Sequence, residues 1–423
     1  MKTRHSIAVA ALALSVVACS SSSTSSTSSK SSTSPTSSTS STSGSSPTSA
    51  ASSSSPVATG TPGSFAASHY STKLDSVCPN PVVIQTDWVP EADHAFLYQM
   101  IGGGGTQAQY TYTGPLGSTG INLQILAGGP GLGNGVSQPS SLYLGNLVKR
   151  VTPTLAFVSS DDAIQYSKQF ATTAVFAEYQ KSPQVIMFDP AKYHITSLAD
   201  LKTAVSGGAK MYVESTTFSF VRWLESQGIP SSAFIGGYAG DLEKFVGSGG
   251  SLLNQGFATN EVYTLGHNTP NWDKTVGYAY IADLGLPFYQ SSVSVANNKL
   301  SQLKPCQQKL VPIMQQAQVD YVTNPSEINT LLADYNNKGL GASFWKTPVD
   351  LNDAAAKIMV SDKLVANTPG TSSLGGFNMS QVDQVLTALV PVYQAAGTSS
   401  LNPAVKSSDI ATNQFIDTTI GLK

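Results

Sequence analysis

The sequence has little net charge, lacks basic runs, and lacks an apolar run of membrane-spanning length after residue 18. Its 423 residues carry a net charge of −2 at pH 7 and no basic run. A nucleic-acid-binding surface usually carries a basic patch, so the composition does not indicate nucleic-acid binding. A membrane-spanning helix needs about 20 apolar residues, and no run of that length follows residue 18.

Cysteine is scarce, and this limits the chemistry that we expect. The sequence has Cys19, Cys78 and Cys306 and no cysteine cluster. No cysteine or histidine stands at metal-ligand spacing, and no Ser-His-Asp or Cys-His motif occurs. The glycine runs lack the lysine of a phosphate-binding loop. We therefore expect no metal, no cofactor and no enzyme activity.

The amino terminus has the layout of an export signal. A basic start at 1–5 and an apolar run at 7–18 precede Cys19, which predicts a signal peptide at residues 1–18. The residues Val16-Val17-Ala18-Cys19 resemble a bacterial lipobox, in which the cysteine is lipidated. The alternative is an ordinary signal peptide followed by a chance cysteine.

Residues 19–64 are rich in Ser and Thr and have almost no apolar side chains to bury. Such a segment cannot offset the entropy cost of ordering, so we predict a disordered tether. We expect an extracytoplasmic protein, lipid-anchored to the cell membrane and in contact with the membrane only through that anchor.

The remaining body alternates short apolar strands with helical patterns. Strands are predicted at 81–85, 121–126, 154–158, 184–188, 210–213 and 252–257, and long amphipathic helices follow residue 287. Alternation of this kind predicts an α/β fold with parallel sheets. About 355 residues exceed what one core usually holds. We predict lobe 1 at 77–165 plus 285–423 and lobe 2 at 166–284, with chain crossings near 166–176 and 284–292 forming a hinged cleft.

Five segments carry a resemblance to a known family. They are Gln85–Tyr98, Tyr179–Met187, Ile195–Lys202, Gly237–Leu242 and Asn254–Tyr263. They resemble the nitrate/sulfonate/taurine and thiamine-precursor (pyrimidine-binding) branch of ABC-transporter solute-binding lipoproteins. Phe257 and Val262 depart from the pattern, which has tyrosine and proline there.

The resemblance implies a two-lobed, periplasmic-binding-protein-like fold of type II, each lobe a mostly parallel sheet flanked by helices. It implies a monomer that captures a small solute and delivers it to an ABC permease. In the pyrimidine-precursor binders the glutamate matching Glu261 faces the ligand.

Candidate ligand-binding residues follow from chemistry and position. Strand-end carboxylates accept N–H groups, aromatic rings stack on flat ligands, and hydroxyls before a helix bind polar groups. The candidates are Asp87, Trp88, His94, Tyr98, Ser215, Thr216, Tyr238 and Glu261. Each has an ordinary alternative, namely core packing for the aromatic residues, capping or turn roles for Asp87 and the hydroxyls, donation to a backbone carbonyl for His94, and a solvated charge for Glu261.

Two points stay open from the sequence alone. Cys78 and Cys306 either form a disulfide, as in many exported proteins, or are two separate buried thiols. The carboxylates predict a flat or amine-bearing solute of pyrimidine type. A sulfonate, nitrate or taurine-type anion, or a surface lipoprotein without a transport role, is the alternative.

Overall fold

The computed structural model describes residues 63–423 apart from 134–135, 273 and 339–344. The predicted signal peptide at 1–18, the lipidated Cys19 and nearly all of the tether at 19–64 lie outside the described residues. The first element is helix α1 at Ser64–His69.

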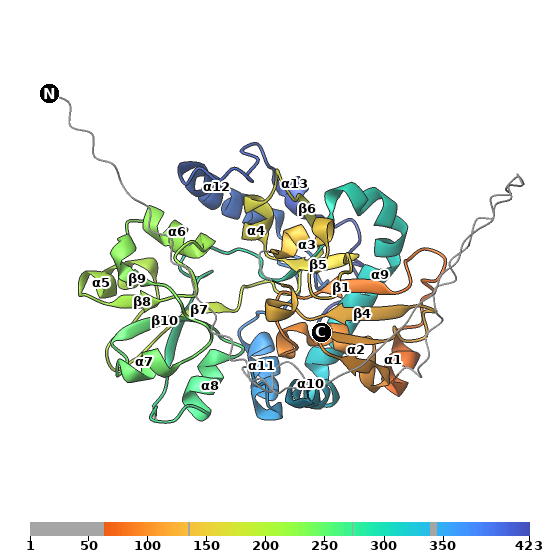
Figure 1. The fold of residues 1–423 in the computed structure, drawn as a ribbon, viewed down its shortest axis with the longest axis horizontal. Helices are drawn as coiled ribbons and strands as arrows, with labels where there is room; N and C mark the ends of the chain where they lie inside the picture. Colours follow the sequence, from red (N-terminus) through yellow and green to blue (C-terminus); the bar gives the residue numbers. More distant parts are fainter. Residues whose placement is uncertain (1–62, 134–135, 273, 339–344) are drawn as a thin grey trace, which may run out of the picture. The chain divides into compact units, whose positions relative to one another are not determined.

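Within the described residues the strands form two sheets, whose elements are labelled in Figure 1. In spatial order the first sheet contains β2 (Thr106–Ala108), β3 (Thr111–Pro115), β4 (Asn122–Leu126), β1 (Val82–Gln85), β5 (Leu155–Val158), β12 (Ser292–Ala296) and β6 (Thr172–Phe176). The second contains β11 (Gly277–Tyr280), β7 (Gln184–Phe188), β10 (Leu252–Phe257), β8 (Lys210–Tyr212) and β9 (Phe234–Ile235).

The two sheets share one strand order. Apart from the β2–β3 edge, the first sheet runs β4-β1-β5-β12-β6, and the second, read from its other edge, runs β9-β8-β10-β7-β11. In each, the first three strands are parallel and the fourth is antiparallel to both of its neighbours. The fourth strand, β7 or β12, is the one that follows the passage of the chain from the other sheet.

This arrangement confirms the predicted α/β class and two-sheet architecture, and in each sheet most strands run in the same direction, as predicted. Both sheets are mixed. A helical crossover brings the chain back to the end of the sheet at which the previous strand began, so the two strands are parallel. Strands β7 and β12 instead follow a passage from the other sheet, without such a crossover. In the first sheet the β2–β3 hairpin adds two further antiparallel pairs.

Strand β6 also shows where the chain leaves the first sheet. It pairs with β12, so the passage follows Phe176 and ends at Gln184, later than the predicted crossing at 166–176. The return passage lies between Tyr280 and Ser292. The limits predicted for the two lobes remain a prediction.

Helices pack on both sheets. The first part of the chain contains η1 (Ala92–His94), α2 (Ala95–Gln99), η2 (Gly102–Gly104), η3 (Gly129–Gly131), α3 (Gln138–Leu144) and α4 (Ser160–Gln165). Between the passages lie α5 (Leu198–Ser206), α6 (Ser219–Ser226), η4 (Ser231–Ala233), α7 (Glu243–Gly247) and α8 (Glu261–His267). The last part contains α9 (Asn297–Thr323), α10 (Ser326–Lys338), α11 (Val349–Ser361), α12 (Met379–Ala395) and α13 (Ser407–Ile410).

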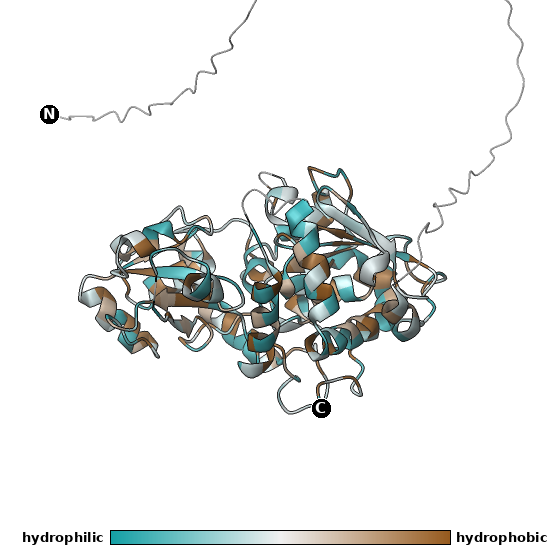
Figure 2. Cartoon of the chain, turned by 90° about the horizontal axis from the view of Figure 1, so that it is seen from below, coloured by the Kyte–Doolittle hydropathy of each residue, from teal (hydrophilic) through white to brown (hydrophobic). Residues whose placement is uncertain are grey.

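The helices are amphipathic, as Figure 2 shows by the mixture of teal and brown residues along them. Among the described helices none combines the length and the apolar character that a membrane crossing requires.

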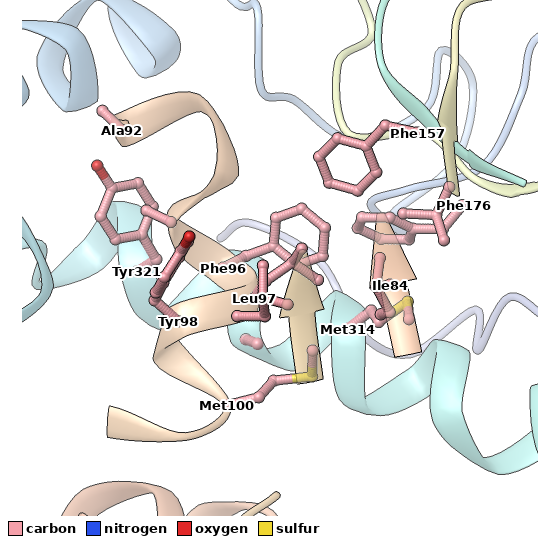
Figure 3. Close-up of a cluster of buried hydrophobic side chains, with 14 of the residues drawn as sticks. Ile84, Ala92, Phe96, Leu97, Tyr98, Met100, Phe157, Phe176, Met314 and Tyr321 are labelled. Carbon is pink, nitrogen blue, oxygen red and sulfur yellow. The ribbon is translucent and has the colours of Figure 1, made fainter. Parts of the chain in front are cut away.

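The core of the first sheet is built from aromatic and aliphatic side chains of strands and helices (Figure 3). Phe96 of α2 lies between Phe157 of β5, at 6.0 Å between ring centroids, and Phe176 of β6, at 5.3 Å. Helix α9 packs against both α2 and β6. This core holds β1 and β5 rigidly, and the candidate residues Asp87 and Trp88 follow the end of β1.

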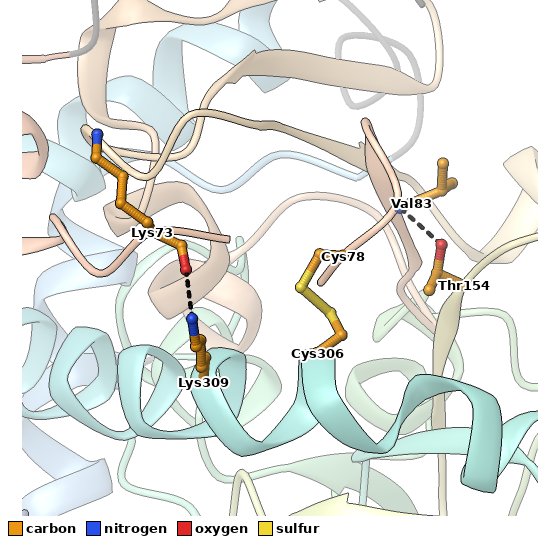
Figure 4. Close-up of a disulfide and its surroundings, with 6 residues drawn as sticks. All are labelled: Lys73, Cys78, Val83, Thr154, Cys306 and Lys309. Carbon is orange, nitrogen blue, oxygen red and sulfur yellow. Dashed lines mark hydrogen bonds between the residues drawn. A yellow bond between two sulfur atoms is a disulfide. The ribbon is translucent and has the colours of Figure 1, made fainter. Parts of the chain in front are cut away.

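Cys78 and Cys306 form a disulfide, with their Cα atoms 4.7 Å apart (Figure 4). It links the segment before β1 to helix α9. The backbone amide of Val83 in β1 is in turn held by the Thr154 hydroxyl. The disulfide therefore fixes the entry to the strand that leads to the candidate site.

Candidate ligand-binding site

The loop after β1 is held by two glycines of a neighbouring turn. The amide of Gly128 donates to the carbonyl of Trp88 at 2.8 Å, and that of Gly129 to the carbonyl of Asp87 at 3.1 Å. A Cβ atom at Gly128 would lie 2.3 Å from the carbonyl carbon of Asp87, and one at Gly129 would lie 2.9 Å from the Trp88 ring. The two glycines thus permit close backbone approach and set the position of two candidate residues.

Asp87 is paired inside the protein. Its Oδ1 lies 2.8 Å from Nε2 of His94, and Ser291, at the end of the return passage, donates to its Oδ2 at 2.5 Å. Burial raises the pKa of Asp87, but the hydrogen bond and charge of His94 and the hydroxyl of Ser291 more than offset it, so that this pKa lies below its ordinary value. Asp87 is therefore the ionised member of the site.

His94 uses both ring nitrogens. Besides the contact with Asp87, its Nδ1 lies 3.1 Å from the carbonyl oxygen of Val89, and the side chain is only 2% exposed. A carboxylate oxygen and a backbone carbonyl oxygen, both acceptors, thus occupy the two ring nitrogens. His94 orients Asp87 and does not offer a ring nitrogen to a solute.

A second pair forms beside the second sheet. The hydroxyl of Tyr238 donates to Oε1 of Glu261 at 2.8 Å, and the amide of Phe257 donates to Oε2 at 2.8 Å. Glu261 is the first residue of α8 rather than part of a strand end, and it is 4% exposed. Burial raises the pKa of Glu261 to about 7 against the lowering effect of its two donors.

Hydrogen bonds join the two segments that carry these pairs. Thr259 donates to Asp93 at 2.8 Å, and Asn260 donates to Glu91 at 3.3 Å. The residues beyond β1 and those beyond β10 are thus brought into one cluster. We call Asp87, Glu91, Asp93 and Glu261 the acidic cluster.

Several residues of this site are absent from the sequence-based candidates. The indole Nε1 of Trp345 donates to Glu91 at 3.0 Å, and its ring lies edge-on to Trp88, with centroids 5.3 Å apart. A Cβ atom at Gly240 would lie 2.2 Å from this ring, so the loop after Gly237 also reaches it. Trp345 stands between α10 and α11, more than 80 residues from either predicted segment, and no motif marks it.

Tyr179 and Glu178 were also missed. The Tyr179 hydroxyl donates to Asp93, and Glu178 beside it is a buried carboxyl, 2% exposed. Both lie on the passage from β6 to β7. The one sequence signal for this pair is Glu178 itself, an acidic residue on the short connection between two buried strands, β6 and β7.

Tyr98 lies elsewhere. It is 1% exposed on α2, and its ring neighbours are Tyr112 at 5.4 Å and Tyr335 at 6.2 Å. Figure 3 shows it in the core group that includes Leu97 and Met100. The structure does not bring it together with Asp87 or Glu261, and the core-packing alternative describes its surroundings.

Ser215 and Thr216 lie in the turn before α6. Ser215 Oγ is 2.8 Å from the hydroxyl of Thr217 and accepts the amide of that residue at 3.1 Å. These hydroxyls are local to the turn. The link from this region to the first sheet comes instead from Ser219, which donates to Asp161 of α4.

The ionisable side chains of the site are almost all acidic. Over the described ranges the lysine ion pairs lie elsewhere, at Lys181–Asp283, Lys274–Asp189 and Lys338–Asp334. In the same ranges no three His, Cys, Asp or Glu side chains are arranged to hold a metal ion. The arrangement suits a ligand that donates hydrogen bonds and carries no negative charge.

The strand order and the flanking helices define the class of fold, which is the two-lobed, type II periplasmic-binding-protein-like α/β fold. No family model and no curated protein matches the chain. Solved structures that it is similar to include the alkanesulfonate-binding protein SsuA from Xanthomonas axonopodis pv. citri bound to MOPS, at 11% identity over 79% of this chain and 100% of that one, with a TM-score of 0.47.

Two further similar structures come from other bacteria. The periplasmic aliphatic sulphonate binding protein SsuA from Escherichia coli is 12% identical over 81% of this chain and 94% of that one, with a TM-score of 0.47. The periplasmic nitrate-binding protein NrtA from Synechocystis PCC 6803 is 10% identical over 80% and 88%, with a TM-score of 0.47. What this chain binds has to be argued from its own residues.

Proposed function

We propose that the chain is the extracytoplasmic solute-binding component of an ABC importer, anchored by lipid on Cys19, that delivers a small, flat, amine-bearing solute to a permease. The export signal at 1–18 and the Ser/Thr-rich tether at 19–64 support export and anchoring. The paired sheets with one strand order support a body whose two halves hold a ligand between them.

The observation that carries the proposal is the joining of the two predicted segments by the Asp93–Thr259 and Glu91–Asn260 hydrogen bonds. These bonds join the segments that carry Asp87, Trp88 and Glu261, which supports one shared site for the three residues. A solute that contacts Asp87 or Trp88 from one half and Glu261 from the other stabilises the closed state by its differential contacts. Ser215, Thr216 and Tyr238 are the further polar candidates, His94 positions Asp87, and Tyr98 is retained only as part of the supporting core.

The sign of the charge favours an amine over a sulfonate, nitrate or taurine-type anion. An anion placed at the acidic cluster would meet four carboxyls without a lysine or arginine from the described residues beside them. The desolvation cost of bringing like charges together makes that complex unfavourable.

A thermal-shift panel tests solute binding. A ligand that binds only the native state raises the melting temperature by mass action. The full-length protein is screened with aminopyrimidines, primary amines, methanesulfonate and nitrate. We expect shifts with the nitrogen bases and none with the anions, and a response to none of them would contradict the transport role and favour a surface lipoprotein without it.

Trp88→Ala locates the site. It should abolish the shift, because it removes the aromatic face beside Asp87. Phe170→Ala is the matched control, since Phe170 is also half-buried and packs against Tyr143 and Tyr166 away from the site. This control should lower the melting temperature of the free protein yet keep the ligand-induced shift.

Anchoring is tested separately by metabolic labelling with a palmitate analogue. The wild type should incorporate the label, and Cys19→Ser should not. Equal labelling of both proteins would place the lipid elsewhere.

A further inference from the structure

Glu178 is a buried carboxyl that lacks a partner. It is 2% exposed, and neither carboxylate oxygen has a hydrogen-bond partner among the described residues. The passage that carries it is fixed on both sides, because Ala177 donates its amide to Gly375 and Gln180 donates its amide to Leu364, each at 2.7 Å. Buried polar groups in native proteins are nearly always satisfied, so an unpaired one indicates a missing partner.

Glu178 lies beside the acidic cluster. It is adjacent to Tyr179 on the passage, and the Tyr179 hydroxyl donates to Asp93 of the cluster. Burial and, after it, the charges of Asp87, Asp93 and Glu91 raise the pKa of Glu178 well above its ordinary value. The unpaired carboxyl is therefore close enough to the cluster for these charges to act on it.

The other carboxyls of the site are satisfied by neutral groups. Asp93 accepts from two hydroxyls, Glu91 from an amide and an indole, and Glu261 from a hydroxyl and a backbone amide. Only Asp87 has a basic side chain, His94, beside it within the described part of the chain. Acidic groups thus outnumber basic groups at the site, and Glu178 is the acidic group that has no hydrogen-bond partner among the described residues.

Aromatic rings adjoin the acidic cluster, because the indole of Trp345 donates to Glu91. The rings of Trp88 and Trp345 lie edge-on at an interplanar angle of 82°, and the Trp88 indole nitrogen, like Glu178, has no partner in the described residues. The face of an indole attracts a cation. One ligand with a positively charged nitrogen and a flat body satisfies both kinds of contact.

We propose that the solute is an organic cation whose charged N–H group binds Glu178 and whose flat body lies against Trp88. This rests on the proposed function and narrows it, because it excludes neutral aminopyrimidines as the preferred ligand. Glu178 is the residue that selects for charge, and the acidic cluster adds a second layer of attraction. An ammonium and an amidinium share the required chemistry.

Matched probes of one shape and different charge test the proposal. Benzamidine and benzylamine are the cations, benzamide and benzyl alcohol their neutral counterparts, and benzenesulfonate the anion. Isothermal titration of the wild-type protein should give affinities at least tenfold higher for each cation than for its neutral counterpart. Equal affinities within a pair, or tighter binding of benzenesulfonate, overturn the cation assignment while leaving solute binding intact.

Glu178→Gln tests the residue. It keeps the shape and removes the charge, so benzamidine affinity should fall at least tenfold and benzamide affinity should stay within twofold. Glu327→Gln, an exposed position on α10, is the control and should leave both unchanged. A Glu178→Gln protein that binds benzamidine like the wild type overturns the role of Glu178.

A response to no probe, cationic or neutral, overturns the cation assignment as well. The solute-binding function is then tested by the thermal-shift panel and by the search for a co-purifying solute. Failure of the cation proposal can therefore be told apart from failure of the proposed function.

Discussion

The hydroxyl of Tyr238 donates to the carboxyl of Glu261 across 2.8 Å, and both side chains are about 95% buried. Tyr238 comes from the loop after β9 and Glu261 from the start of α8, 23 residues apart. A buried carboxyl with neutral donors takes up a proton more readily than one in water, because burial disfavours the charged form. This pair therefore makes stability depend on pH.

Glu261→Gln should remove a pH-dependent part of the free energy of unfolding. Burial raises the pKa of Glu261 in the folded state to about 7, above its ordinary value of 4.5. The stabilisation that this provides is present below pH 4.5 and is lost as the pH rises through 7. The difference between wild type and variant should shrink over this window by on the order of 3 kcal/mol.

Urea denaturation at several pH values between 4.5 and 8 measures that difference. Glu243→Gln, at an exposed position on α7, should follow the wild type at every pH. If the difference in free energy of unfolding between Glu261→Gln and the wild type is constant, or grows with pH, the raised pKa of Glu261 is contradicted.

Gly128→Ala should disturb the candidate site through the backbone. A Cβ atom there would lie within 2.5 Å of backbone atoms of Thr86, Asp87 and Trp88, so the loop must move. We expect a loss of at least about 2 kcal/mol in stability together with loss of ligand-induced thermal shifts. Gly103→Ala is the control, because its Cβ would meet open space, and it should be neutral or slightly stabilising. Similar behaviour of the two variants would count against a fixed loop.

Removing the disulfide should destabilise the protein without altering the site. Cys78 and Cys306 are 228 residues apart, and a cross-link over a long loop stabilises mainly by restricting the unfolded chain. Cys78→Ala/Cys306→Ala should lower the free energy of unfolding by about 2–5 kcal/mol. Dithiothreitol should lower that of the wild type and leave the variant unchanged, and insensitivity of both to the reductant would show that the bond does not form.

Much of the fold follows from short-range patterns. All six predicted strands occur, and two of them, Gln184–Phe188 and Leu252–Phe257, have the predicted limits. The missed strands lack a strong apolar signal. Strand β6 begins with two threonines, β12 alternates serine with valine, and β2 and β3 lie in a glycine-rich stretch. Such segments become strands because they pair with other strands of the sheet, and this pairing leaves no pattern in their own sequence.

The sequence predicted candidate residues only within the segments that resemble the family. Asp87 and His94 are seven residues apart in one of these segments, and Tyr238 and Glu261 lie in two others, with α7 and β10 between them. Trp345 and Glu178 join the site through contacts across the fold, and their burial depends on chain far away. Tyr98 lies four residues after His94, a spacing that predicted a site residue, but on helix α2 its side chain is buried in the core.

The most direct test of the account is the identification of what the protein holds when it is purified without denaturation from the cells that produce it. Native mass spectrometry of the wild type should detect a small nitrogen-containing solute at one equivalent, and Trp88→Ala/Glu261→Gln should have lost it while retaining its fold by circular dichroism. A folded variant that retains the same solute, or a wild type that carries an anionic one, would contradict the account.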